Sequence, residues 1–427
     1  MVKITPFEVE QWMDRYETTP GVINIAETCC ASISIDDLIS LDTAESACSP
    51  LQLSKKLTYG DILGSEILRQ RVASLLNRDL NHHSPGLEPL NAENVIITQG
   101  AIAANFLAFY TLVGPGDHVI SVYPTYQQLY SVPESLGAEV SLWKLKAENG
   151  YVPDVDELEG LVKANTKLLV LNNPNNPTGA TIPTPTLQSI LDFCSSRNIT
   201  ILSDEVYSPL FHSLPASPSS STTSIAPPSI LSLSPSGTEK TCVTLSTGST
   251  SKALALAGLR LGWIVSRSPS LLRAIASARD YTAISVSQLD DQVASYALSP
   301  SVLPALLERN LDLARTNLAL LTEFVEGKYS KVCSWVRPTA GTTALVQFRN
   351  LSKGGVLVDD ASFVLDVLDK THVLFMPGSP CFGLGTDFKG LAELMFLEAS
   401  QGTHLGSVPK HGNLIPGGCY RLTSYLV

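Results

Sequence analysis

The sequence predicts an α/β protein whose main domain is a mostly parallel sheet covered by helices on both faces. Short apolar runs alternate with longer segments of helical periodicity through the middle of the 427-residue chain. Continuous apolar runs of this kind are typical of strands that are buried on both faces of a sheet. Polar residues gather where the runs end, and open α/β sheets bind their ligands at that edge.

The first predicted elements lie between residues 94 and 179. The run NVIITQG at 94–100 is predicted as a strand that ends in glycine, and AIAANFLAFYTLV at 101–113 continues as an apolar helix. Residues 114–124, GPGDHVISVYP, predict a turn followed by a strand. The segment TKLLVLNNPNNPTG at 166–179 predicts a buried strand that runs into a loop of proline, asparagine and glycine.

The later elements continue this alternation of helices and strands. An amphipathic helix is predicted at 186–198, and strands are predicted at 199–207, 241–249 and 259–266. Apolar residues at helical spacing then predict a long helix at 302–327, which leads into a second domain.

Residues 212–239 interrupt the pattern because serine, proline and threonine dominate them. A segment of this composition buries too little apolar surface to offset the entropy that ordering costs. We therefore expect a surface insertion or flexible loop there.

The composition argues against several classes of protein. A net charge of -11, without a cluster of lysine and arginine, argues against nucleic-acid binding. No apolar run is long enough to span a membrane, and the N-terminal segment does not resemble a signal peptide. The eight cysteines follow no C-x-x-C pattern, so we expect no disulfide framework, no metal site and a cytoplasmic location.

Two cations stand in a segment otherwise made of small and aliphatic residues, STGSTSKALALAGLRLGW at 246–263. We expect this segment to be buried, so Lys252 and Arg260 need specific partners. Burial disfavours the charged form of a lysine, and a depressed pKa would make Lys252 a nucleophile able to form a Schiff base with an aldehyde. The planar fork of Arg260 suits a phosphate. An aldehyde and a phosphate on one small molecule describe pyridoxal 5'-phosphate (PLP).

Other strand ends offer the remaining contacts that this cofactor needs. Asp204, in SDEVY, would pair with the protonated pyridine nitrogen and keep the ring an electron sink. Tyr207 and Asn176 are expected to hydrogen-bond the phenolic oxygen of the ring. Tyr126, in YPTYQQ, is expected to stack on the ring, with plain packing as the alternative.

A phosphate site is expected at the turn between the strand at 94–100 and its helix. Gly100 stands at this turn, and the free backbone N–H groups of Ala101 and Ile102 are expected to face the phosphate. Ser249 and Ser251, just before the lysine, are short hydroxyl residues that would complete the site.

The motifs NPNNPTG, SDEVY and STSKALALAGLRLGW, in this order, resemble the class I/II aminotransferases of the PLP-dependent fold type I. The resemblance runs from about Tyr59 to Trp263 and, more weakly, to Arg421. It implies a role for each matching position: Lys252 as the Schiff-base lysine, Asp204 as the partner of the pyridinium, Asn176 and Tyr207 as ligands of the phenolic oxygen, Arg260 as the phosphate arginine and Tyr126 as the stacking aromatic.

The resemblance also implies a division of the chain and an assembly. The fold is expected to have a large PLP-binding domain with a mixed, mostly parallel sheet at 56–295, and a smaller α+β domain formed by 1–55 and 296–427. The element LTYGDILGSEILRQRVA resembles one in which Tyr59 reaches the phosphate of a neighbouring subunit, so a homodimer is expected. CYRLTSY resembles the element whose arginine, here Arg421, holds the substrate α-carboxylate, with a structural salt bridge as the alternative.

The activity implied is the transfer of an amino group between an amino acid and a 2-oxo acid. One departure bears on the substrate: INIAETCCASISIDDL at 23–38 stands where the family usually has a glycine-containing loop, so Glu27 is expected to join Asn176 and Arg421 in contacting the substrate. This departure keeps open a PLP-dependent lyase or cyclase, such as a relative of 1-aminocyclopropane-1-carboxylate synthase or a C–S lyase, and a non-catalytic relative. With the segment 212–239, it favours specialised metabolism over housekeeping metabolism.

Overall fold

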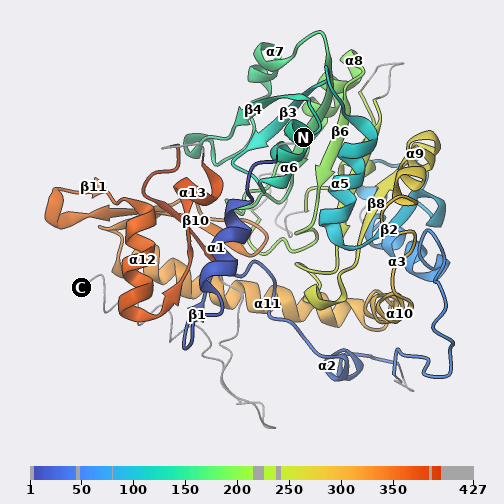
Figure 1. The fold of residues 1–427 in the computed structure, drawn as a ribbon, viewed down its shortest axis with the longest axis horizontal. Helices are drawn as coiled ribbons and strands as arrows, with labels where there is room; N and C mark the ends of the chain where they lie inside the picture. Colours follow the sequence, from blue (N-terminus) through green and yellow to red (C-terminus); the bar gives the residue numbers. More distant parts are fainter. Residues whose placement is uncertain are drawn as a thin grey trace.

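The computed structural model describes residues 4–44, 49–78, 80–214, 226–236, 242–383 and 387–395. A seven-stranded sheet with the order β2-β8-β7-β6-β5-β3-β4 forms the centre of the larger part of the molecule (Figure 1). Strands β3 to β7 are parallel, and β8 runs antiparallel to both of its neighbours, β2 and β7. The strands are β2 (Val95–Thr98), β3 (His118–Tyr123), β4 (Glu139–Lys144), β5 (Thr166–Asn172), β6 (Thr200–Asp204), β7 (Thr244–Ser249) and β8 (Gly262–Ser266). The predicted mixed, mostly parallel sheet of fold type I is confirmed.

Helices cover both faces of this sheet because its strands are apolar on both sides. In β5, Leu168 and Val170 face one apolar cluster, and Leu169 and Leu171 face another. This alternation follows from the two-residue period of a strand. The first cluster includes α5 (Gly100–Leu112), α6 (Gln128–Ser135) and α9 (Pro269–Arg279), and the second includes α3 (Glu66–Leu76), α7 (Leu158–Leu161), α8 (Thr184–Arg197) and α10 (Gln288–Ala297).

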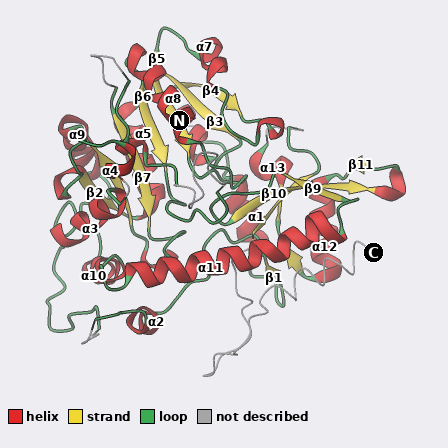
Figure 2. Cartoon of the chain, turned by 180° about the vertical axis from the view of Figure 1, so that it is seen from behind, coloured by secondary structure: helices red, strands yellow, loops and turns green. Residues whose placement is uncertain are grey.

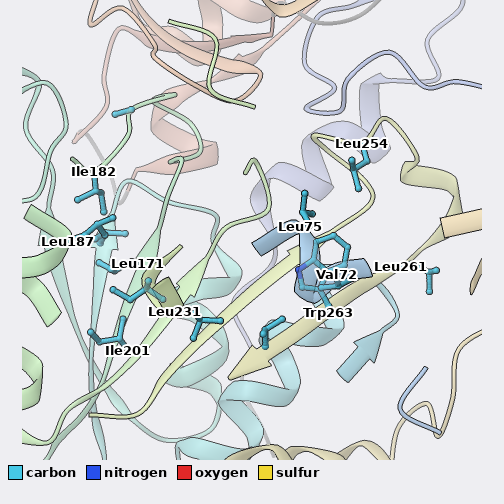
Figure 3. Close-up of a cluster of buried hydrophobic side chains, with 14 of the residues drawn as sticks. Val72, Leu75, Leu171, Ile182, Leu187, Ile201, Leu231, Leu254, Leu261 and Trp263 are labelled. Carbon is cyan, nitrogen blue, oxygen red and sulfur yellow. The ribbon is translucent and has the colours of Figure 1, made fainter. Parts of the chain in front are cut away.

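Figure 3 shows part of the second cluster, in which side chains far apart in the sequence meet. Leu187 of α8 and Ile201 of β6 lie near Leu171 of β5, and Trp263 of β8 lies near Val72 of α3. A core of this size anchors the strands whose ends carry the candidate site.

A second, smaller sheet lies beside the first and is built around β10 (Figure 1). The long helix α11 (Leu303–Thr322) runs from α10 to the region of α12, as both views show (Figure 2). It continues as a π-helical segment, Glu323–Lys328. The other elements of this part are β9 (Cys333–Trp335), β10 (Thr343–Asn350), β11 (Val356–Leu357), α12 (Asp360–Thr371), β12 (Val373–Leu374), β13 (Met376–Pro377), α13 (Gly378–Phe382) and β14 (Leu391–Met395).

The N-terminal segment joins this smaller part. Helix α1 (Glu8–Tyr16) packs against α13, and β1 (Ile23–Asn24) pairs in parallel with β12. Two short helices, α2 (Ile35–Ser40) and α4 (Leu80–His83), lie elsewhere along the chain. The pairing of β1 with β12 brings residues just after it to the edge of the large sheet.

Two features differ from the sequence predictions. Strand β4 was not predicted, because as an edge strand it is only partly buried and its apolar pattern is weak. The segment 212–239 was expected to lie on the surface, yet Ile230 and Leu231 are fully buried, and the backbone N–H of Ile230 donates to the Glu205 carboxylate at 3.0 Å. The surface expectation is therefore wrong for 230–233, whereas Ser234 and Ser236 are exposed, and 215–225 and 237–241 lie outside the described residues. Within the described part of the chain, none of the helices has the length and apolar character needed to cross a membrane.

Candidate active site

A cavity of about 690 Å³ opens at the carboxyl ends of the parallel strands and extends to the N-terminal segment. Such an edge is where open α/β sheets bind ligands, because loops from several strands converge there. Most of the predicted site residues line this cavity: Glu27, Ala101, Ile102, Tyr126, Asn176, Asp204, Tyr207, Ser249, Ser251, Lys252 and Arg260. Gly100, the first residue of α5 after β2, directly precedes Ala101 and Ile102.

Lys252 follows the end of β7, and its side chain is 22% exposed. Its Nζ donates to Thr28 Oγ1, lies 3.4 Å from Cys29 Sγ and lies 3.9 Å from Glu27 Oε1. The backbone holds this loop in place, because the Cys30 N–H donates to the Lys252 carbonyl at 3.4 Å. The amine therefore lies inside the cavity among polar groups.

These polar neighbours overturn the expected pKa of Lys252. Burial lowers the pKa of the amine, but the Coulombic effect of Tyr207, Cys29 and Glu27 outweighs it, so that the net shift is upward. The sequence prediction of a depressed pKa assumed an apolar pocket, but the polar neighbours of the amine shift its pKa in the opposite direction.

Asp204 ends β6, and its carboxylate is buried with two donors. Asn105 Nδ2 donates to Oδ2 at 2.8 Å, and the Val206 N–H donates to Oδ1 at 3.1 Å. Burial raises the pKa of this carboxyl above its ordinary value, and the two donors and Lys252 oppose the shift only in part. A cationic ligand atom beside Asp204 would reverse this penalty.

Asn105 was missed by the sequence reasoning. It lies on α5, and its Oδ1 accepts from Thr247 Oγ1 at 2.7 Å while its Nδ2 holds Asp204. The signal was a single amide within the otherwise apolar helical run AIAANFLAFYTLV. Buried amides need partners, and the strand end opposite supplies the carboxylate.

Tyr207 and Asn176 meet beside the lysine. Asn176 Nδ2 donates to the Tyr207 hydroxyl at 3.1 Å, and the Asn176 N–H donates to Asn172 Oδ1 at 2.7 Å. Burial raises the pKa of Tyr207 to about 12, although Lys252 opposes the shift. The Asn176 Oδ1 atom is buried and has no hydrogen-bond partner among the described residues, so one acceptor in the cavity remains for a ligand.

The N-terminus of α5 presents free backbone donors to the cavity. Gln99 at the cap position makes no side-chain hydrogen bond, so the first N–H groups of the helix lack a side-chain cap. Gly100 has a φ of 75°, and a Cβ there would lie 3.1 Å from Arg260 Nη2. The Ser251 N–H donates to Ser249 Oγ at 3.2 Å, and both serines are buried.

Arg260 differs from its prediction in one respect. The segment 246–263 was expected to bury both of its cations, but Arg260 is exposed, with Nη1 donating to the Ala257 carbonyl at 3.1 Å. A φ of 51° at the end of a short 3₁₀ turn points the residue out of the apolar segment. Its guanidinium still lines the cavity beside the α5 N-terminus.

Three further predicted residues are Tyr126, Tyr59 and Arg421. Tyr126 lines the cavity, but its ring packs against Phe7 with centroids 4.9 Å apart, and its hydroxyl donates to Glu10 at 3.4 Å. Tyr59 is 81% exposed and does not line the cavity of its own chain. Arg421 lies outside the described residues.

Glu393 on β14 is a further ionisable group that the sequence reasoning did not identify. Its side chain is 1% exposed, and neither carboxylate oxygen has a hydrogen-bond partner among the described residues. Burial holds the pKa of this carboxyl well above its ordinary value, with Lys252 opposing the shift. An ionised and unpartnered carboxylate at this depth costs stability.

The raised pKa of Glu393 gives a test by pH. A carboxyl with a raised pKa stabilises the folded chain at low pH and loses this contribution as the pH rises from the ordinary value of 4.5 through the folded-state pKa. Glu393→Gln removes the ionisation, so we expect the free energy of unfolding of the variant, minus that of wild type, to increase with pH. Urea unfolding at several pH values between about 5 and 8 measures this difference. The exposed Glu148→Gln serves as control, and a Glu393→Gln difference that stays flat with pH contradicts the expectation.

The residues around the cavity suit PLP. Lys252 offers an amine to the aldehyde, and the buried Asp204 carboxylate suits a protonated ring nitrogen. The uncapped N-terminus of α5, with Arg260 and two serines, suits a phosphate. The groups that each part of this cofactor requires converge on one cavity.

Comparisons with known proteins agree with this arrangement. Residues 42–386 match the family model described as aminotransferase class I and II. The chain is 31% identical to capreomycidine synthase from Streptomyces vinaceus over 70% of this chain and 72% of the relative, and 31% identical to an arginine–pyruvate transaminase from Pseudomonas aeruginosa over 48% and 47%. A crystal structure of a PLP-dependent aminotransferase from Streptococcus suis superposes with a TM-score of 0.81 at 32% identity, covering 99% of this chain and 98% of that one. The chain therefore belongs to the aminotransferase class I and II family of PLP fold type I, and its cofactor is pyridoxal 5'-phosphate.

Proposed function

We propose that the protein is an aminotransferase that moves an amino group between an amino acid and a 2-oxo acid. The observation that carries the proposal is the convergence of the Lys252 amine, the Asp204 carboxylate and the Asn176–Tyr207 pair on one cavity of about 690 Å³. In a family member with these groups in one cavity, Lys252 can serve as the base, and Asp204 can balance the positive charge on the ring nitrogen of the cofactor. The structure of the site favours this over a non-catalytic relative, which has no need to keep a buried carboxylate facing a cavity.

In this proposal each part of the cofactor has its own residues. Lys252 forms the Schiff base, and Asp204, oriented by Asn105, pairs with the ring nitrogen. Asn176 and Tyr207 bind the phenolic oxygen. The N–H groups of Ala101 and Ile102, together with Gly100, Ser249, Ser251 and Arg260, bind the phosphate, and Tyr126 lies against the ring.

The cofactor, when bound, supplies an electron sink for the negative charge left at the substrate α carbon. Once the substrate amine has replaced Lys252 Nζ in the bond to the cofactor, the freed Nζ would be placed to take the α proton as general base and to return it to the neighbouring carbon. Asp204 holds the proton on the ring nitrogen by its negative charge. Thr28 accepts a hydrogen bond from Nζ and so keeps the amine oriented inside the cavity.

Binding of the substrate is assigned to three residues. Arg421 is proposed to bind the α-carboxylate, and Asn176 has a free acceptor or donor toward the substrate once Tyr207 is engaged. Glu27 lies 3.9 Å from the lysine amine and is proposed to contact the substrate beside the reacting carbon.

A second reaction on the same scaffold is favoured by one observation. The relative that matches 70% of this chain is named a synthase and not a transaminase, and the loop that carries Glu27, Thr28 and Cys29 surrounds the lysine. A PLP-dependent cyclase or lyase also begins by removing the α proton, so Lys252 and Asp204 serve either outcome. In this proposal, the loop around the amine selects between the two reactions once the proton has been removed.

One incubation separates the two reactions. The holoenzyme is mixed with single amino acids and no 2-oxo acid, and pyridoxamine 5'-phosphate and organic products are measured by liquid chromatography with mass spectrometry. An aminotransferase accumulates one equivalent of pyridoxamine 5'-phosphate per active site together with a 2-oxo acid, and then stops. Continued release of a cyclised or eliminated product without that accumulation contradicts the aminotransferase and supports the second reaction.

We also propose a homodimer in which Tyr59 reaches the phosphate of the neighbouring subunit. Tyr59 is 81% exposed and lies outside the cavity of its own chain, which supports a role in another one. Large apolar side chains near it in sequence and on α5 are also exposed, namely Leu53, Leu57, Ile62, Ile67, Phe106 and Tyr110. The particle mass in solution by light scattering measures the assembly, and a monomeric holoenzyme contradicts it.

A further inference from the structure

Negatively charged side chains outnumber positively charged ones in the cavity lining when the residues assigned to the cofactor are set aside. Among the residues that the structure describes, the charged lining consists of Lys252, Arg260, Asp204 and four further carboxylates, Glu10, Asp14, Glu17 and Glu27. The proposed cofactor contacts engage Lys252, Arg260 and Asp204. In the described part of the cavity, the charged groups that are left for a substrate are therefore these four carboxylates.

Three of these carboxylates come from one helix. Glu10, Asp14 and Glu17 follow each other along α1 and its C-terminal end at helical spacing, so they share one face, and all three side chains are exposed. Glu10 also accepts a hydrogen bond from the Tyr126 hydroxyl at 3.4 Å. A row of like charges on one wall of a cavity concentrates ligands of opposite charge.

Glu27 extends this negative wall to the reacting centre. Its Oε1 lies 3.9 Å from Lys252 Nζ, and its side chain is 41% exposed, so it remains accessible to a ligand. Its Oε1 also accepts from the Cys29 N–H at 3.1 Å, which orients the carboxylate.

Glu393 is a second, independent observation beside this wall, because its buried carboxyl group has no hydrogen-bond partner among the described residues. It lies directly opposite Met376 across antiparallel strands, and residues so paired point to the same face of a sheet. Met376 lines the cavity, so the Glu393 side chain lies on the cavity side of the smaller sheet. Its carboxyl group is 1% exposed, and an approaching cation would offset the cost of ionising it there.

We propose that the amino acid that enters this cavity carries a cationic side chain, a guanidinium or an ammonium group, which is attracted by the α1 carboxylates and held by Glu27 beside the buried Glu393 side chain. This inference rests on the proposed reaction at Lys252. It adds the class of substrate, because a neutral or acidic side chain would face the same carboxylates without compensation. The long, flexible side chains of such amino acids reach from the reacting centre toward the wall formed by α1.

Matched pairs of amino acids test the charge and hold the shape constant. Arginine and citrulline have nearly the same shape, but the guanidinium of arginine is replaced by a neutral urea group in citrulline. Lysine and norleucine form the second pair. We expect the kcat/KM of the half-reaction, followed by the absorbance change of the holoenzyme, to favour the cationic member of at least one pair by about tenfold or more, equivalent to about 1.4 kcal/mol. The advantage is expected to shrink as salt is added.

Two variants locate the effect on the wall. Glu27→Gln is expected to reduce the advantage of arginine over citrulline about tenfold. The double variant Asp14→Asn with Glu17→Gln, which alters only exposed carboxylates remote from the lysine contacts, is expected to reduce it severalfold. Glu8→Gln is the matched control on the same helix, because Glu8 does not line the cavity, and it is expected to leave the ratio unchanged.

These experiments distinguish a wrong substrate class from a wrong reaction at Lys252. If neutral or acidic amino acids react as fast as the cationic ones, the inference is wrong while the reaction at Lys252 stands. If no amino acid changes the absorbance of the holoenzyme, the proposed reaction itself fails. Equal losses for arginine and citrulline in both cavity variants overturn the assignment of the carboxylates to the side chain.

Discussion

The Lys252→Ala variant is expected to lose turnover and covalent attachment of the cofactor together. Proton transfer by a positioned side chain alone contributes roughly 10²- to 10⁴-fold, and this variant also loses the covalent link, so kcat should fall by more than about 10³-fold. Lys252 lines the cavity, and its amine is held there by a hydrogen bond to Thr28. No other described lysine lines the cavity.

Reduction with borohydride makes the attachment measurable without relying on activity. In wild type, the reduced adduct is expected on the peptide that contains Lys252, and mass spectrometry locates it. Lys144→Ala is the control, since this exposed lysine pairs with Asp387 at 3.0 Å and lies outside the cavity. It should keep both adduct and turnover. A full adduct on another lysine in Lys252→Ala, with turnover retained, would refute the role of Lys252.

The part of the site that faces the cofactor could be predicted because it depends on strand ends. Asp204, Asn176, Gly100 and Lys252 each follow a short apolar run, and parallel strands bring their carboxyl ends to one edge of a sheet. The chemistry of each residue type then restricts the ligand. The order of the motifs along the chain was enough to place these residues on one cavity.

The substrate wall could not be predicted in the same way. Helix α1 reaches the cavity because β1 pairs with β12, a contact between residues about as far apart as the described chain allows. Nothing in EVEQWMDRY indicates which face of this helix meets a cavity. Glu393 shows the same limit, because its burial depends on the pairing of β14 with β10 and β13.

The pKa of Lys252 shows why a local pattern can mislead about electrostatics. The residues next to it in sequence are small and apolar, and they predict a depressed pKa. The groups that decide the pKa are Tyr207, Cys29 and Glu27, all of which come from other segments. The environment of a charge is set by tertiary contacts, so the sequence indicates the chemistry of the residue but not its protonation.

Asp204→Asn is expected to keep the fold and lose most of the turnover. The substitution preserves size but removes the negative charge that holds a proton on the ring nitrogen. Truncating one partner of a buried, hydrogen-bonded charge pair costs about 2–5 kcal/mol, so kcat should fall between about 30-fold and a few thousand-fold. The affinity for the cofactor should fall with it, and titration of the cofactor-free variant with PLP measures this loss separately from turnover.

The neighbouring residue supplies a control that is buried to the same degree. Glu205 is 5% exposed, but its carboxylate accepts from the Ile230 N–H at 3.0 Å and from Ser246 Oγ at 2.8 Å, and it does not line the cavity. Glu205→Gln should therefore lower the free energy of unfolding while kcat stays within a few-fold of wild type. If Asp204→Asn lost only stability and kept its turnover, as Glu205→Gln is expected to do, the buried charge at 204 would be structural, and the ring nitrogen would need no carboxylate for the reaction.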